Sequence, residues 1–98
     1  IRIMKVIVEL DYNSDDFKLL HVNSVEEYFK EYFSKTEGIL YNEKLEAIYY
    51  ECDIPYVPIV GQEVNCKFGN CNVTYSCLSL DENQNGYFDK SRIMVKEI

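Results

Sequence analysis

The residues best suited to metal chemistry lie in an acidic segment late in this 98-residue chain. The run DENQNGYFD at 81–89 places oxygen-bearing side chains where an EF-hand loop has its first Ca²⁺ ligands, with Gly86 at the sharp turn. An EF-hand loop also needs a bidentate glutamate at its twelfth position, where this chain has Arg92. Asn85-Gly86 is in addition a strong signal for the tip of a β-hairpin. Both interpretations of residues 81–92 stay open, and the pattern favours the hairpin loop.

Four cysteines are the candidates for covalent or thiolate chemistry: Cys52, Cys66, Cys71 and Cys77. Their spacing matches no zinc knuckle or zinc ribbon. A two-residue turn at Gly69-Asn70 would place three of them on one apolar strand face, together with Val64, Phe68, Val73 and Tyr75. That face favours free core thiols, while two disulfides and a metal site remain as alternatives.

The only imidazole available for acid–base or nucleophilic catalysis is that of His21. A cysteine–histidine pair would need a thiol of lowered pKa beside this ring. The pattern keeps the two apart, because His21 ends a predicted surface strand and the cysteines from 66 to 77 lie on the predicted core face. The chain also lacks a glycine-rich phosphate loop. We therefore expect no catalytic residues, no cofactor and no metal site.

Hydrophobic alternation predicts the strands that must position these side chains. Six segments have the required Val, Ile, Tyr and Phe content: 3–10, 17–22, 45–52, 63–68, 71–80 and 88–97. The first two would form an opening hairpin. Residues 53–58 are excluded from the centre of a sheet, because Pro55 and Pro58 cannot donate to a ladder.

One amphipathic helix is predicted at about residues 24–37. Ser24 and Glu27 have the spacing of a capping box, and Gly38 is a typical helix stop. Apolar side chains recur on one helical face at Val25, Tyr28, Phe29, Tyr32 and Phe33. Such a face needs a sheet to cover. The sequence predicts a single α+β domain over residues 1–98, with an antiparallel, strongly bent sheet or small barrel of about six strands and this helix packed on it.

Residues 54–98 resemble short phage and mobile-element proteins that have a small SH3-like β-barrel. The resemblance rests on Ile54-Pro55, then VPIVGQEV at 57–64, and then alternating strands. In those proteins a Pro-x-x-Gly-x-x-Val step leads into the barrel, often with a basic residue where this chain has Val60. The resemblance implies a barrel-like second half and a phage or mobile-element origin.

The net charge of the chain argues against two classes of partner, nucleic acids and anionic membranes. The chain has 10 Lys and Arg against 17 Asp and Glu, so its formal net charge is −7. A nucleic-acid-binding protein would show a basic stripe, and a protein held on anionic lipid would show a polybasic patch. No apolar run approaches the ~20 residues that span a bilayer. We expect neither direct nucleic-acid binding nor membrane association. Residues 1–10 are too short and charged for a secretory signal, and we expect a cytoplasmic location in a host cell. Secretion stays open as an alternative, because a cleaved signal peptide would also leave no Met at position 1.

Acidic residues and tyrosines coincide between residues 41 and 58. Tyrosine is typical of interfaces, because it buries a large area at low entropic cost and keeps a polar end. The candidate partner-binding residues are Tyr41, Glu43, Glu46, Tyr49, Tyr50, Glu51, Asp53 and Tyr56. The alternative is a solvated acidic surface with ordinary strand tyrosines.

These observations favour a non-enzymatic binding protein that inhibits a host protein, such as an anti-CRISPR or other anti-defence protein. Its partner would carry a basic face of the kind that binds nucleic acid, which the acidic surface would meet. Two alternatives stay open. One is an oligomeric protein that sequesters a small molecule, such as a nucleotide signal, between tyrosines. The other is a virion or assembly component.

Overall fold

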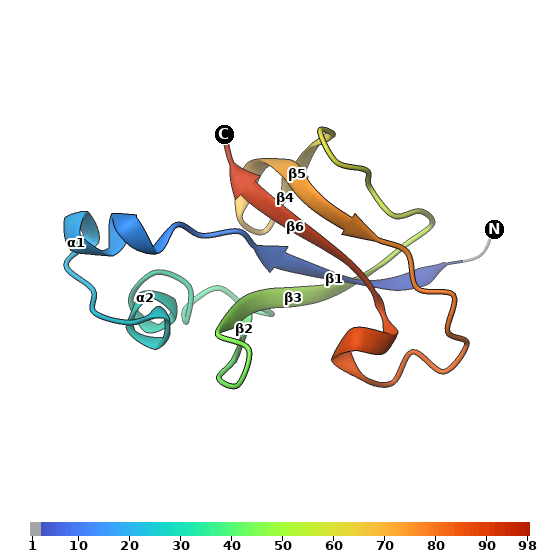
Figure 1. The fold of residues 1–98 in the computed structure, drawn as a ribbon, viewed down its shortest axis with the longest axis horizontal. Helices are drawn as coiled ribbons and strands as arrows, with labels where there is room; N and C mark the ends of the chain where they lie inside the picture. The colour runs from blue at the N-terminus through green and yellow to red at the C-terminus, as the bar shows by residue number, and fades with distance from the viewer. Residues whose placement is uncertain (1–2) are drawn as a thin grey trace.

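A computed structural model describes residues 3–98, which form one six-stranded sheet with short helices at one end (Figure 1). The strands are β1 (Met4–Leu10), β2 (Leu40–Asn42), β3 (Ala47–Ile54), β4 (Glu63–Cys66), β5 (Gly69–Cys77) and β6 (Ser91–Glu97). Their order across the sheet is β2-β3-β1-β6-β5-β4. The predicted α+β class and the number of strands are confirmed, but β2 was not predicted and the strand expected at 17–22 is absent.

The sheet is mixed, so the prediction of a wholly antiparallel sheet is wrong. β1 and β6 run parallel, with Val8 opposite Ile93, and every other pair is antiparallel. The chain after β1 does not turn back as the strand that was expected at residues 17–22, so no hairpin partner occupies the edge of β1. β6 therefore takes the place beside β1 and runs in the same direction.

Residues 17–22, predicted as a strand, are mainly helical instead. A 3-10 turn η1 (Ser14–Asp16) continues into α1 (Phe17–Leu20), and His21 ends α1 in the left-handed conformation. The Asn13 side chain accepts a hydrogen bond from the Asp15 N–H at 3.0 Å and so caps the turn. This turn lets the Phe17 ring stack on Tyr12, with centroids 5.8 Å apart. An aromatic contact and a cap thus outweigh the strand propensity of the segment.

The predicted amphipathic helix is present but shorter than expected, as α2 (Val25–Tyr32). The Ser24 hydroxyl accepts from the Glu27 N–H at 3.1 Å, and the Glu27 carboxylate accepts from the Asn23 N–H at 3.0 Å. The helix ends before residue 37, because Phe33 leaves the helical conformation. This places the Phe33 ring edge-on against Phe68, with centroids 5.7 Å apart.

The core lies on one side of the curved sheet, called here the core face, with α2 over one end. Its buried residues are Val6, Val8, Leu10, Val25, Ile39, Ile48, Tyr50, Phe68, Cys71, Val73, Ile93 and Val95. The opposite side is called the outer face. The sheet does not close, so the predicted barrel is wrong in this respect. β4 has only four residues and pairs only with β5 in the sheet of residues 3–98.

The hairpin of β4 and β5 turns two residues earlier than predicted. Cys66 pairs with Gly69, which leaves residues 67–68 in the turn. A β-bulge then lies between Val73 and Tyr75. The bulge sends Tyr75 to the outer face, although simple alternation would put it on the core face.

No helix within residues 3–98 is long and apolar enough to cross a membrane.

Candidate functional site

A groove with a volume of about 360 Å³ opens between β3 and β4, and is called here the β3–β4 groove. Tyr50, Cys52 and Ile54 line it from β3, and Val64 and Cys66 line it from β4. Core residues of β1 and β6 also line it, and the 55–62 connection supplies the remaining lining. Its volume lies within the range of small-ligand and peptide-anchoring sites.

Strand alternation explains the apolar lining of this groove and the places of the acidic side chains near it. In β3, the side chains at 50, 52 and 54 point inward, so Glu51 and Asp53 point to the outer face. In β4, Val64 and Cys66 point inward, and Glu63 lies exposed at the edge. Of these three carboxylates only that of Glu63 lines the groove, and those of Glu51 and Asp53 lie on the opposite face of β3. The lining among residues 3–98 contains no Lys or Arg.

The 55–62 connection is tied down and forms a fixed wall. The Ser76 hydroxyl donates to the Pro58 carbonyl at 2.7 Å, and the Gly61 N–H donates to the Val73 carbonyl at 2.9 Å. The Gln62 side chain donates to the Tyr56 hydroxyl at 3.1 Å. These bonds hold Tyr56, which is 53% exposed, at the mouth of the groove. The groove is therefore preformed.

Tyr50 closes the other end of the groove. Its hydroxyl accepts the Lys67 N–H at 3.4 Å, and its ring packs on Phe68 with centroids 5.6 Å apart. Burial raises the pKa of the Tyr50 hydroxyl above its ordinary value. The ring therefore stays neutral at physiological pH and joins β3 to the β4–β5 turn.

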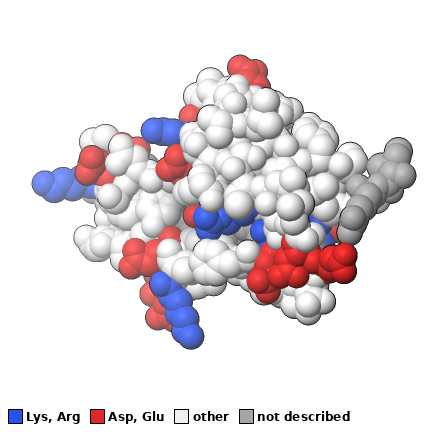
Figure 2. All heavy atoms as spheres, turned by 45° about the vertical axis from the view of Figure 1, so that its right-hand side comes forward, with Lys and Arg blue, Asp and Glu red and all other residues white. Residues whose placement is uncertain are grey.

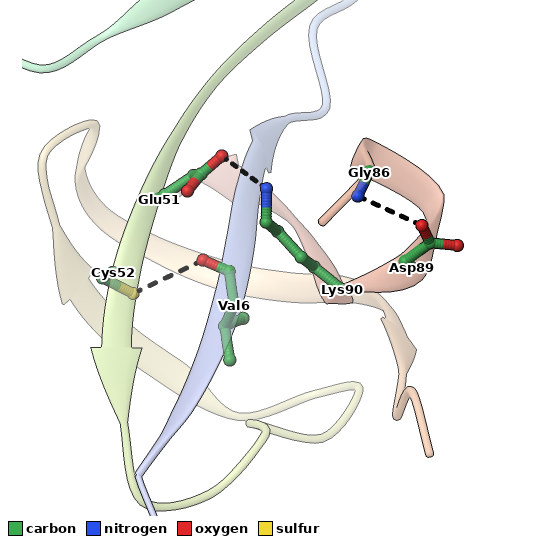
Figure 3. A network of polar contacts seen from close by, with 6 residues as sticks. All are labelled: Val6, Glu51, Cys52, Gly86, Asp89 and Lys90. Carbon is green, nitrogen blue, oxygen red and sulfur yellow. Dashed lines mark hydrogen bonds and ion pairs between the residues drawn. The ribbon is translucent and has the colours of Figure 1, made fainter. Parts of the chain in front are cut away.

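Cys52, which lines the groove, and the buried Cys71 are weak nucleophiles. All four cysteines of the chain have free thiols. The Cys52 thiol points to the Val6 carbonyl, with sulfur and oxygen 3.8 Å apart (Figure 3). Burial raises the pKa of Cys52, and it raises the pKa of Cys71 to about 12. Cys77 is exposed on the outer face, contrary to its predicted place in the core, because the bulge shifts its side chain.

The structure brings two of the eight predicted partner-binding residues, Tyr50 and Tyr56, to the groove. Tyr50 is buried, so only the part of its ring that faces the groove is available to a partner.

The other six predicted residues lie elsewhere. Glu51 and Asp53 point to the outer face of β3, away from the groove lining. Tyr41 packs on the Phe29 ring of α2, with centroids 5.5 Å apart. Glu43 and Glu46 are exposed in the β2–β3 turn, where the Glu46 carbonyl accepts from the Tyr12 hydroxyl. Tyr49 lies on the outer face. The predicted set is therefore not one continuous surface.

The outer face carries a polar and aromatic cluster that the sequence did not predict. Lys90 reaches across β1 to Glu51, with nitrogen and oxygen 3.0 Å apart (Figure 3). Arg92 lies 3.7 Å from Glu9, whose carboxylate also accepts from the Tyr87 hydroxyl. The possible signal was the Lys90-x-Arg92 spacing, which puts two cations on neighbouring outer-face positions next to acidic strands.

These pairs neutralise Lys90 and Arg92 internally. Lys5, opposite Asp53 in the register of β1 and β3, and Lys96 are in no ion pair formed within residues 3–98. The side chains of Lys90 and Arg92 are only 11% and 23% exposed. In Figure 2, acidic side chains gather prominently on this side of the molecule, next to basic side chains that are partly covered. No ion pair formed within residues 3–98 includes Asp53 or Glu63.

The 81–92 segment is a loop with a 3-10 turn, η2 (Tyr87–Asp89), between β5 and β6. Asp81 accepts from the Asn83 N–H at 2.9 Å, and Asp89 accepts from the Gly86 N–H at 3.1 Å (Figure 3). These two carboxylates thus accept hydrogen bonds from backbone N–H groups of the same loop. Within residues 3–98, no group of three or more His, Cys, Asp or Glu side chains is placed to hold a metal ion.

No protein family model, curated protein or solved structure matches this chain.

Proposed function

We propose that this protein is a non-enzymatic binding protein whose β3–β4 groove takes a basic segment of a partner protein. One observation carries the proposal. The groove is largely apolar, Glu63 is its one charged lining residue among those described, and Glu51 and Asp53 lie on the outer face of the strand that forms one wall.

The groove offers apolar contact in its interior and charge at its border. Tyr50 and Tyr56 present aromatic surface, which dominates the energetics of many protein interfaces. The carboxylates of Glu51, Asp53 and Glu63 are exposed, so at physiological salt they act mainly on partners within about 8 Å. Such charges speed association and select partners more than they add affinity.

A host protein with a nucleic-acid-binding face is the concrete form of this proposal. Such a face presents Lys and Arg side chains, and the −7 net charge of this chain suits them. By occupying that face, the protein would inhibit nucleic-acid binding, as an anti-defence inhibitor does. The groove is a poorer fit for a nucleotide signal, because a phosphate group would meet Glu63 and no lining cation.

A displayed library of random twelve-residue peptides tests this function. Peptides selected on the immobilised protein are made synthetically, and their affinity is measured by fluorescence anisotropy from 0.05 to 0.5 M salt. We expect peptides rich in Lys or Arg, whose binding weakens as salt rises. Selection of neutral or acidic peptides with no salt dependence would contradict the proposal.

A pair of matched charge variants locates the binding. Asp53→Lys with Glu63→Lys should weaken the selected peptides about tenfold, since two favourable charge contacts become repulsive. The control Asp15→Lys with Glu31→Lys makes the same change in net charge on exposed residues of the helical end. An equal loss in both variants would mean that only the overall charge matters and that the groove is not the site.

A further inference from the structure

We infer that the partner segment binds as an added β-strand between the free edges of β3 and β4. This inference rests on the proposed function, because it specifies how the basic segment occupies the groove. Main-chain hydrogen bonds would supply affinity, as in other cases of strand addition, and the groove would select alternate side chains.

The second half of β3 has a free edge. β2 pairs only with its first three residues, the last pair being Leu40 with Tyr49. Residues 50–54 have β1 on one side and, within residues 3–98, no strand on the other. In an antiparallel ladder, the N–H and C=O of every second residue point to the same side. Alternate residues of this segment therefore direct donors and acceptors away from β1.

β4 supplies the facing edge. It is the last strand in the sheet order, and residues 63–66 pair only with β5. Both edges border the same groove, since Cys52 and Ile54 line it on one side and Val64 and Cys66 on the other. The contact of Tyr50 with Lys67 brings the ends of the two segments together. The curved sheet thus lacks a strand between β3 and β4.

Neither edge contains a lysine, a proline or a bulge to block strand pairing. Native edge strands are commonly blocked by lysine, proline or a bulge. The segments YECDI at 50–54 and EVNC at 63–66 contain no Lys or Pro, and the one bulge within the described strands lies in β5. Their outward charges are all acidic.

The acidic charges decide which strand fits. A second copy of this chain would bring Glu51, Asp53 and Glu63 against the same carboxylates, and like charges on adjacent strands are destabilising. A strand with Lys or Arg on its outward side would meet Asp53 on one edge and Glu63 on the other, while Glu51 is already paired with Lys90. Its inward side chains would have to be small and apolar to enter the groove beside Cys52 and Val64. The occupant is therefore an extended segment of a partner protein that alternates basic and apolar residues.

Backbone methylation of the strongest selected peptide tests the binding mode. One derivative carries N-methyl groups at two odd positions of its central residues, and a second carries them at two even positions. A strand held by two edges uses the N–H groups of both sets, so each derivative should bind at least about tenfold more weakly. A strand held by one edge would tolerate methylation of one set, which would overturn the two-edge inference.

Amide hydrogen exchange on the whole protein gives the second measurement. Saturation with the unmethylated peptide should slow exchange most at residues 50–54 and 63–66. If the peptide binds and responds to Asp53→Lys with Glu63→Lys but protects other segments, strand addition is wrong and the proposed function stands. If the groove variant and the Asp15→Lys with Glu31→Lys control bind the peptide equally, the proposed function fails and the inference falls with it.

Discussion

Replacing Tyr87 with phenylalanine would remove one hydroxyl from the outer face and leave the ring in place. That hydroxyl donates to the Glu9 carboxylate, whose side chain is only 14% exposed and also lies 3.7 Å from Arg92. The ring packs edge-on against Tyr49, with centroids 5.1 Å apart, and phenylalanine keeps this contact. The substitution therefore reports the hydrogen bond that ties η2 to β1.

The expected cost follows from the charge of the acceptor. A hydrogen bond to a charged group contributes about 1.5–3 kcal/mol to stability. Residues 81–86, which precede Tyr87, are mostly exposed, so we expect a value in the lower half of this range. We expect Tyr87→Phe to lower the free energy of unfolding by ~2 kcal/mol. With a urea m-value of ~1–1.5 kcal/mol/M for a domain of this size, the midpoint should fall by ~1.5 M.

Urea unfolding followed by circular dichroism at pH 7 measures this shift, and Tyr49→Phe is the matched control. Within residues 3–98, no hydrogen bond involves the Tyr49 hydroxyl, so its loss should change stability by less than ~0.5 kcal/mol. A double-mutant cycle of Tyr87→Phe with Glu9→Gln should show a coupling energy of at least ~1 kcal/mol. Equal effects of the two phenylalanine substitutions, or no coupling, would refute the reasoning.

Four further predictions concern the groove, the core and the loops. Asp53→Lys should weaken binding of the selected basic peptides several-fold. Glu46 lies in the β2–β3 turn, away from the groove, so Glu46→Lys should leave the affinity of these peptides unchanged. Anisotropy titration of both variants measures the difference. Burial raises the pKa of Cys71 from 9.0 to about 12 in the folded protein, so above pH 9 unfolding releases the thiol proton. The free energy of unfolding should therefore fall as the pH rises above 9, with a slope of up to ~1.4 kcal/mol per pH unit. Urea unfolding of Cys71→Ala in reducing buffer should lack this pH-dependent loss, and an unchanged slope would be evidence that burial of Cys71 is not its cause. Ser24→Ala should cost ~1 kcal/mol and lower Tm by about 4–8 °C in a thermal melt, because the Glu27 N–H loses its cap. Millimolar CaCl₂ should leave Tm unchanged, because Asp81 and Asp89 accept from loop N–H groups; a rise of several degrees would show that the loop binds the cation.

The parts of the fold that the sequence predicts are those that short-range interactions determine. The helix start at Ser24 follows from a capping box within four residues, and the strands near 4–10, 47–54 and 91–97 follow from alternation. The parallel pairing of β1 with β6 depends on residues more than 80 positions apart, which no local pattern reports. Residues 14–20 fold as a 3-10 turn and a short helix, in which Phe17 packs not only on the nearby Tyr12 but also on Tyr28 of α2.

The candidate site was predictable to the same extent. The segment 41–58 contains the groove residues Tyr50 and Tyr56, and Tyr50 belongs to β3. Alternation then divides the side chains of β3, with Tyr50 inside and Tyr49 and Glu51 outside. Composition along a sequence cannot show this division until the register is known. The contribution of β4 was missed because Val64 and Cys66 were assigned wholly to the core.

A bulge bends its strand and increases the local twist, and the bulge of β5 lies between Val73 and Tyr75, where β5 is paired with β6. The unpaired Thr74 is held there, since its hydroxyl donates to Asp11 at 2.8 Å. β4 pairs with β5 residues 69–72, just before the bulge, so we expect the bend at the bulge to set how close β4 lies to β3. Removing the bulge by deleting Thr74 should flatten β5 and expose Cys66, which labelling with a thiol reagent would detect as faster modification relative to Cys77.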